Sequence, residues 1–501
     1  MSKGYLTLFF RFALGLSLLL ALTACKQQNE AATEAQPYAR QTLTSQAVLP
    51  TRTTGQANSR EKPTPLPAIP PTPNQLTPTN LGASSADLNN VVVEVWQPWS
   101  GDAGDVFKET LEAYSRINQW GIRVHVKSFP DFGSLDEAMD TAISTHDLPD
   151  VVVDYGYQAR QWDAREVLID LTPYVNDPVW GLTKGEQADF LQNFWSEDIV
   201  QDPAINLQER LGIPFYRSAY ALFYNQSWAT EMGFTSPPAT PRDFKEQACA
   251  AAQELSVQNG GKGEGEGGWL VTPQPATLVG WIYAMGGNLI QNGSDSYTFN
   301  TAKSQAALEY IKDLQNSGCA WDDSTLYPTD EFANRRALFI VGSLYDIPSQ
   351  LAAFNQAGNA DTWAVIPFPS DNKPVVVTYG PSLMITGSTP ARQLADWLVV
   401  KWLVYPPNLT QWVKVTGTYP TRQSVLGYLS ENGETGAPWT QALELLPDGR
   451  AEPGLASWSI LRWALNDTLD ELLSPQLSEE RIPGLLENLD SLAAEVVNQL
   501  P

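Results

Sequence analysis

Side chains that could act as nucleophiles, general bases or soft metal ligands are few in this chain. Its 501 residues include only two histidines, His125 and His146, and three cysteines. No cysteine and histidine stand at the spacing of a zinc site, so we expect neither a metal nor another cofactor. His125 alternates with apolar residues in a β-rich run, which favours a solvated strand position. Chemistry through imidazole or thiolate is therefore not indicated.

Carboxylates are plentiful. The 56 acidic residues leave open a secreted hydrolase that acts on glycans through two carboxyl groups, although no G-x-S-x-G nucleophile motif accompanies them. The balance of 31 basic against 56 acidic residues gives a net charge of −25. That charge argues against nucleic acid and against attraction to anionic lipid, because both need clustered Lys and Arg.

Residues 94–102 read EVWQPWSGD and hold two tryptophans three positions apart. An aromatic ring can cover the C–H face of a sugar, and neighbouring polar groups can bind its hydroxyls. Trp96 belongs to the preceding apolar run, so we expect it in the core. Trp99 and Ser100 lie in the turn beyond that run. We predict that these two contact a ligand, with a core position of Trp99 as the alternative.

The segments around these tryptophans alternate between strand and helix patterns. β-rich runs at 91–96, 122–126 and 149–154 are separated by two helical stretches, the second opened by a capping box of Ser134 and Glu137. This alternation predicts a parallel sheet covered by helices on both faces.

Parallel sheets of this kind bind ligands beyond the carboxyl ends of their strands. Two loops leave strands there, at 97–102 and 154–157. The first holds Trp99 and Ser100, and the second adds Asp154 and Tyr155 as predicted ligand contacts. Asp154 could instead cap a helix.

The N-terminus has the pattern of an export signal. Lys3 and Arg11 precede a short apolar or small-residue run at 12–24, and Cys25 follows directly. Such a segment is typical of a secretory signal, with a signal anchor as the alternative. Leu22-Thr23-Ala24-Cys25 resembles a bacterial lipobox. We therefore expect removal of residues 1–24 and lipidation of Cys25.

The composition changes after the lipobox. Residues 25–88 are rich in Pro, Thr, Ser and Gln, with few large apolar side chains. Such a segment cannot bury enough apolar surface to offset its ordering entropy, so we expect a disordered spacer. Contact with the membrane would then run through the lipid anchor only.

Two cysteines remain in the exported part of the chain, Cys249 and Cys319. Exported proteins meet oxidising conditions, so we predict a disulfide that closes a loop of about 70 residues. Two free buried thiols are the alternative. A glycine motif at Gly263, Gly265 and Gly268 follows a helical stretch instead of a strand, so we read it as a surface loop and not as a nucleotide site.

Several other segments have clear patterns. An extended run covers 212–225, Thr240 and Pro241 start a helix, and further helices are expected at 302–316 and from Thr389. A buried-type strand covers 336–341.

Eight pieces of sequence together resemble the bacterial extracellular solute-binding proteins of the sugar-binding type, the group that includes maltose-binding protein. These pieces occur in the family's order across residues 91–425 and read VVVEVWQPWSGD, LPDVVVDY, GIPFYRSAYALFYN, SPPATPRDF, WIYAMGGNLI, RRALFIVGSLYD, TWAVIPFPS and VTGTYPTR.

The resemblance implies a two-lobe α/β fold of the periplasmic-binding-protein type II class, with mixed sheets flanked by helices and hinge strands between the lobes. Lobe one would comprise 89–220 and 367–405, and lobe two 221–366 and 406–501. The hinge crossings would fall near 219–224, 366–368 and 405–407.

The resemblance also implies further ligand contacts. The matching positions are Arg217, Ser218, Thr277, Trp281, Gly287, Ser343, Tyr345, Tyr379 and Arg422. Arg217 and Arg422 could instead pair with structural carboxylates. Sugar-binding relatives often carry a stacking tryptophan where this chain has Leu344, so either Tyr345 takes over that contact or the ligand presents no sugar face there.

The function implied is that of a monomeric, non-enzymatic receptor of an ABC import system, lipid-anchored on the outer side of the membrane. It would close two lobes around a mono- or oligosaccharide and deliver it to membrane permease subunits. A secreted glycan-acting hydrolase and a binding protein that feeds a sensor kinase are the alternatives.

Overall fold

The computed structural model describes residues 81–202, 207–261, 265–272, 274–291, 296–322, 328–432 and 437–500. The predicted signal segment 1–24, the predicted lipidation site Cys25 and the spacer up to residue 80 lie outside these ranges. Among the described residues, no helix combines the length and apolar character that a membrane span requires.

Residues 81–88, expected in the spacer, belong to the folded part. They include a short 3₁₀ helix, η1 (Ser85–Leu88), that contacts helix α14 (Pro390–Leu403). The amide of Ser84 donates to Asp87 Oδ2 at 2.8 Å, and Leu88 is fully buried. The predicted spacer boundary is therefore too late, because Leu88 has a core site to fill.

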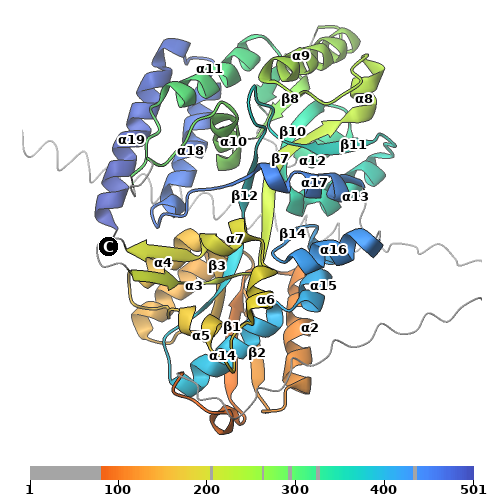
Figure 1. Cartoon of the computed structure of the whole chain (residues 1–501). Coiled ribbons are helices and arrows are strands. Elements are labelled where there is room, and N and C mark those ends of the chain that lie inside the picture. The colour runs from red at the N-terminus through yellow and green to blue at the C-terminus, as the bar shows by residue number, and fades with distance from the viewer. Residues whose placement is uncertain are drawn as a thin grey trace, which may run out of the picture. The chain divides into compact units, whose positions relative to one another are not determined.

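The first lobe is built around a five-stranded sheet in the order β2-β1-β3-β13-β6 (Figure 1). The strands are β1 (Val92–Gln97), β2 (Arg123–Ser128), β3 (Val151–Tyr155), β6 (Ile213–Pro214) and β13 (Pro381–Ile385). The predicted parallel arrangement is confirmed for β2, β1 and β3, while β13 runs antiparallel to both β3 and β6. The helices of this lobe are α2 (Gly101–Ile117), α3 (Phe132–Thr145), α4 (Gly156–Asp163), α5 (Thr172–Asn176), α6 (Lys184–Ala188), α7 (Gln192–Glu197), α14 (Pro390–Leu403), α15 (Pro406–Thr416) and α16 (Gln423–Asn432), and a hairpin is formed by β4 (Ile199–Asp202) and β5 (Leu207–Arg210).

Helices cover both faces of this sheet because successive strand residues point to opposite sides. Val93 and Val95 pack with residues of α2 and α14, whereas Trp96 and Val152 pack with residues of α3 and α4 in a separate cluster. His125 on β2 is exposed, as predicted.

The second lobe is built around an eight-stranded sheet with the path β15-β12-β7-β10-β8-β9, in which β11 and β14 also pair with β7. The strands are β7 (Tyr216–Asn225), β8 (Gly267–Val271), β9 (Ala320–Asp322), β10 (Ala337–Ser343), β11 (Trp363–Ile366), β12 (Val376–Tyr379), β14 (Tyr419–Pro420) and β15 (Gly449–Ala451). The helices are α8 (Gln226–Glu231), α9 (Pro241–Gln258), α10 (Pro275–Ala284), α11 (Ala302–Asn316), α12 (Pro328–Ala333), α13 (Ile347–Ala357), α17 (Ala437–Glu444), α18 (Trp458–Leu473) and α19 (Ile482–Gln499). Three short 3₁₀ helices are η2 (Leu344–Asp346), η3 (Leu446–Asp448) and η4 (Glu479–Arg481).

The chain passes between the lobes at other points than predicted. β6 belongs to the first sheet and β7 to the second, so the first passage lies at Phe215. β12 pairs with β7 and β13 pairs with β3, so the second lies at Gly380, where a Cβ would collide with the Tyr216 carbonyl oxygen. The predicted third passage at 405–407 is not one, because α14 and α15 on either side of it both pack against α2.

Several elements consequently change lobe relative to the predicted boundaries, among them β12, α15 and α16. β12 was expected in lobe one but extends the second sheet through Val377, which pairs with Tyr220. α15 was expected in lobe two but packs against α2, because it buries an apolar stripe that includes Leu409 and Trp412 there. Sequence position alone did not reveal these tertiary partners.

Local start signals explain several elements. Thr240 and Pro241 begin α9, with Asp243 completing a capping box, and α11 and α14 start as predicted. The start of α3 differs, because Asp131 Oδ1 accepts from the Ser134 amide at 2.7 Å and so caps the helix three residues earlier than the expected cap, Ser134. The glycine-rich segment also differs, because Gly268 lies inside the buried strand β8.

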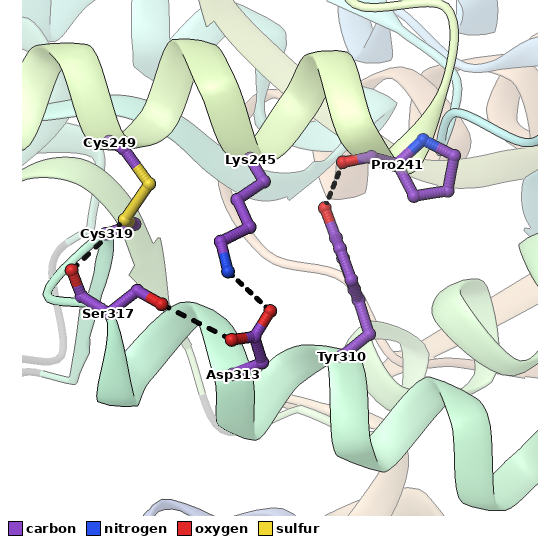
Figure 2. Close-up of a disulfide and its surroundings, with 7 residues drawn as sticks. All are labelled: Pro241, Lys245, Cys249, Tyr310, Asp313, Ser317 and Cys319. Atoms are coloured by element: carbon purple, nitrogen blue, oxygen red, sulfur yellow. Dashed lines mark hydrogen bonds and ion pairs between the residues drawn. A yellow bond between two sulfur atoms is a disulfide. The ribbon is translucent and has the colours of Figure 1, made fainter.

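The predicted disulfide between Cys249 and Cys319 is confirmed and ties α9 to a residue three positions beyond the end of α11 (Figure 2). The same two helices are joined by an ion pair of 2.5 Å between Lys245 Nζ and Asp313 Oδ2. The Tyr310 hydroxyl also donates to the Pro241 carbonyl at 2.6 Å. These contacts fix one edge of the second lobe.

Candidate functional site

A cavity of about 320 Å³ lies between the carboxyl end of β3 and the end of β15. It is lined by Tyr155, Gly156, Tyr157, Arg160, Ser196, Glu197, Asp198, Ile199, Arg217, Thr378, Tyr379, Gly380, Ala451, Glu452, Pro453 and Gly454. Both lobes contribute, so the predicted crevice beyond the strand ends is present. Its volume lies at the lower end of the range for small-molecule sites.

Tyrosine rings form much of the cavity's environment. Tyr155 stacks on Tyr157 with ring centroids 5.3 Å apart, and Tyr379 stacks on Tyr220 at 4.7 Å. Tyr155 and Tyr379, from different lobes, are 6.3 Å apart. Burial raises the pKa of both hydroxyls well above 10, so each stays protonated and can donate as well as accept.

Sequence reasoning named Tyr155 and Tyr379 but not Tyr157 or Tyr220. Tyr157 stood in the loop that was already indicated as ligand-facing. Tyr220 follows Ser218 by two positions on β7, and residues two apart share a face of a strand. Both could therefore have been found from strand-end and alternation signals.

Four predicted residues meet where β10 and β12 flank β7. The hydroxyls of Ser218 and Ser343 are 3.0 Å apart, and that of Ser343 is 2.6 Å from the Tyr379 hydroxyl. The Tyr345 amide donates to Ser343 Oγ at 3.0 Å. Ser218 and Ser343 are buried behind Tyr379 and do not line the cavity. Their hydrogen bonds orient the tyrosine hydroxyl that does.

Arg217 lines the cavity and is also held in a structural ion pair, so both of its predicted roles are compatible. Its Nε donates to Glu197 Oε2 at 2.6 Å, and its Nη1 donates to the carbonyls of Tyr216 and Pro381. The side chain is 1% exposed. Burial raises the pKa of Glu197, and the positive charge of Arg217 opposes that shift.

A second ion pair stands on the side of lobe two. Glu452 Oε2 accepts from the Trp458 indole at 2.8 Å, and its Oε1 lies 3.6 Å from Arg462 Nη2. Neither Glu452 nor Arg462 was singled out in the sequence, because no local motif marks them. Guanidinium groups thus accompany the carboxylates on both sides of the cavity.

Asp154 lies behind the cavity wall, not in it. It is fully buried, and its Oδ1 accepts from the Tyr155 amide at 2.6 Å. Burial and then the neighbouring Asp136 raise the pKa of Asp154 well above its usual value, and burial raises that of Asp136 to about 6. The two carboxyl groups are coupled, because a negative charge on Asp136 favours a proton on Asp154.

The structure corrects the location predicted for Trp99. Its ring is only 6% exposed and packs among aromatic side chains, with its centroid 4.6 Å from that of Trp412 and 5.3 Å from that of Phe107. Gln97 fixes the turn by accepting from the Trp99 amide at 2.6 Å. Ser100 is exposed as the N-cap residue of α2. Neither Trp99 nor Ser100 lines the cavity.

The remaining predicted contacts also lie away from this cavity. Thr277 Oγ1 donates to the Thr272 carbonyl, and Trp281 is fully buried against Phe244. A Cβ at Gly287 would lie 2.7 Å from Ile282 Cγ2. Arg422 has the structural role left open for it. Its Nη1 lies 3.4 Å from Asp189, and its guanidinium stacks at 4.1 Å on Phe190.

No group of three or more His, Cys, Asp or Glu side chains suited to a metal ion occurs in the part of the chain that the structure describes. The predicted residues that line the cavity are Tyr155, Arg217 and Tyr379.

Two α/β lobes with a cavity between them define a solute-binding protein of the two-lobe class. Residues 109–441 match the family model described as bacterial extracellular solute-binding protein, and the chain belongs to this family. Putative binding proteins of Brucella abortus (strain 2308) and Brucella suis biovar 1 (strain 1330) are 23% identical over 382 residues. That alignment spans 75% of this chain and 86% of each relative.

Solved structures of maltose-binding-like proteins share the fold. The GacH receptor of Streptomyces glaucescens has 18% identity and a TM-score of 0.66, covering 82% of this chain and 100% of the receptor. The sugar-binding protein MalE of Xanthomonas citri has 19% identity and a TM-score of 0.68, covering 82% of this chain and 98% of MalE. The expected two-lobe fold is thereby confirmed.

Proposed function

We propose that this chain is the receptor of an ABC import system, and that it captures a carbohydrate between its lobes and delivers it to membrane permease subunits. As a member of the extracellular solute-binding family it acts outside the cytoplasm. Anchoring through a lipid on Cys25 is part of the proposal and rests on the lipobox-like sequence. The tyrosine-walled cavity between the lobes is the observation that carries the choice of solute.

The chemistry of that cavity suits a neutral, polyhydroxylated solute. Protonated tyrosine hydroxyls at Tyr155 and Tyr379 can each donate and accept, as sugar hydroxyls do. The buried charges are paired within the protein, Arg217 with Glu197 and Arg462 with Glu452. A charged solute would have to compete with these pairs, whereas a sugar can hydrogen-bond to them without breaking them.

Several structural neighbours hold carbohydrates. The GacH receptor was solved with acarbose and an acarbose homologue, and a Thermotoga lettingae solute-binding protein with α-D-tagatose. These ligands support the choice of carbohydrate here by likeness of fold.

Isothermal titration calorimetry with a panel of mono- and oligosaccharides tests the solute class. We expect micromolar or tighter binding for at least one sugar, with no turnover of a chromogenic glycoside. Heat from a peptide or polyamine and none from any sugar would contradict the carbohydrate assignment. Labelling with radioactive palmitate, lost in Cys25→Ala, tests the anchor separately.

A further inference from the structure

Two hydrogen bonds join the lobes at the rim of the cavity. Gln161 Nε2 donates to the Ala456 carbonyl at 2.8 Å and to Ser459 Oγ at 2.6 Å. Ser459 Oγ also donates to the Ala456 carbonyl at 3.2 Å, so the three groups form a closed triangle. Both hydrogens of one side-chain amide are thus directed at the opposite lobe.

The partners belong to different cores. Gln161 lies on α4, which contacts β3 and β13 of the first sheet. Ser459 is the second residue of α18, which packs against α10, α11 and α19 beside the second sheet. Figure 1 shows α4 and α18 on the same side of the molecule, in the lower and upper lobe respectively. A relative movement of the lobes at this edge must break these hydrogen bonds.

The bridge stands directly beside the binding cavity. Tyr157 and Arg160 of α4 line the cavity from lobe one, and Glu452 and Gly454 line it from lobe two. A Cβ at Gly454 would be 3.9 Å from Arg160 Nε, so the two walls approach each other closely here. Gln161 therefore lies next to the point where the two cavity walls come together.

We propose that Gln161 is a positioning residue, a latch to Ala456 and Ser459 that favours the arrangement of the lobes in this structure over a more open one, even without solute. The purpose of this latch rests on the proposed function of solute capture. The latch itself consists only of groups of this chain and needs no solute to form. Because its partners carry no net charge, its strength should not depend on salt. Losing one such pair of neutral hydrogen bonds shifts a closing equilibrium by about three- to tenfold.

Distances between the lobes test the latch without any solute. Spin labels on Glu137→Cys in α3 and Ala494→Cys in α19, both exposed, report the separation by pulsed electron resonance in the full chain. We expect Gln161→Ala to move the unliganded distribution toward longer distances, Ser459→Ala to move it less, and the double variant to match Gln161→Ala. Gln258→Ala is the matched control, because it removes a glutamine bond to Glu254 within a single helix.

Release kinetics supply a second reading. Dissociation of maltotriose, followed by stopped flow, should be about three- to tenfold faster in Gln161→Ala, with an unchanged melting temperature. A distance shift together with no binding of any sugar would support the latch while contradicting the carbohydrate assignment. Superimposable distance distributions for Gln161→Ala and the wild type would overturn the latch.

Discussion

The hydroxyl of Ser343 lies 2.6 Å from the hydroxyl of Tyr379, at the point where β10 and β12 end on either side of β7. This contact connects the second sheet to the cavity wall. Because Ser343 also accepts from the Tyr345 amide, its lone pairs and proton are directed by the sheet and by η2. The Tyr379 hydroxyl is therefore held in one orientation before a solute arrives.

Removal of that hydroxyl should weaken binding while sparing the fold. Tyr379→Phe keeps the ring that stacks on Tyr220 but loses the hydrogen bond, so we expect the dissociation constant for the best-bound sugar to rise about two- to tenfold. Calorimetry measures the change. Tyr310→Phe is the matched control, because it removes a buried hydroxyl bond to Pro241 far from the cavity. Equal effects of both variants would count against a binding role for Tyr379.

Arg217 should matter for stability as well as for the cavity. Arg217→Met leaves Glu197 without its buried partner, so we expect the free energy of unfolding to fall by about 3–5 kcal/mol at neutral pH. Without the guanidinium the pKa of Glu197 rises further, and the deficit should shrink as the pH is lowered. Urea unfolding at several pH values measures both effects. Arg165→Met, which breaks an exposed pair with Asp140, should cost less than about 1 kcal/mol.

The two tryptophans of EVWQPWSGD should contribute about equally to the stability of the fold. Trp96 is 5% exposed and Trp99 is 6% exposed, in different apolar clusters. Replacement of either by alanine should lower the free energy of unfolding by about 3–5 kcal/mol. A loss of sugar affinity in Trp99→Ala without a loss of stability would restore the original interpretation of that ring as a ligand platform. Urea unfolding and calorimetry on the same samples decide between the two.

Elements with strong local signals were predictable from the sequence. β1 to β3 and the starts of α9, α11 and α14 follow from periodicity and capping residues, which act over a few positions. The points at which the chain passes between the lobes were not predictable from the sequence, because they depend on which strand pairs with β7. Val377, for example, follows an apolar run that fits either sheet, and only its pairing with Tyr220 assigns it.

The site was predictable only in part for the same reason. Tyr155 lines the cavity because strand ends converge, as the parallel sheet implied. Trp99 stands at such an end too, but Trp412 from α15 covers its ring, and no local pattern announces that contact. Glu452 was missed because it reaches the cavity only through the packing of the C-terminal segment, which also supplies its partner Arg462.

The buried carboxyl pair of Asp136 and Asp154 should make stability depend on pH. Burial raises the pKa of Asp136 from 3.8 to about 6 in the folded chain. The resulting stability is complete below about pH 4 and is lost as the pH rises through about 6. In Asp136→Asn a neutral amide replaces this buried carboxyl group, so no charge is buried at this position at any pH. We therefore expect the variant to gain on the order of 1–2 kcal/mol relative to the wild type between pH 4 and pH 7.5.

Urea unfolding across this pH range, with the exposed Asp147→Asn as control, measures that gain. Parallel curves for Asp136→Asn and the wild type would contradict a raised pKa of Asp136 in the folded chain.

Loss of the disulfide should destabilise the second lobe without altering the cavity. Cys249 and Cys319 close a loop with a sequence separation of 70, so the double replacement by serine should lower the free energy of unfolding by about 4 kcal/mol in the chain-entropy model. The bond joins α9 to the end of α11, and neither helix lines the cavity, so sugar affinity should stay within twofold of the wild type. Chemical unfolding and calorimetry measure the two quantities.

Single replacements serve as controls, because each should destabilise about as much as the double one if the bond, and not the individual side chains, is responsible. A large loss of affinity in the double variant would instead mean that this edge of lobe two helps to position the cavity wall.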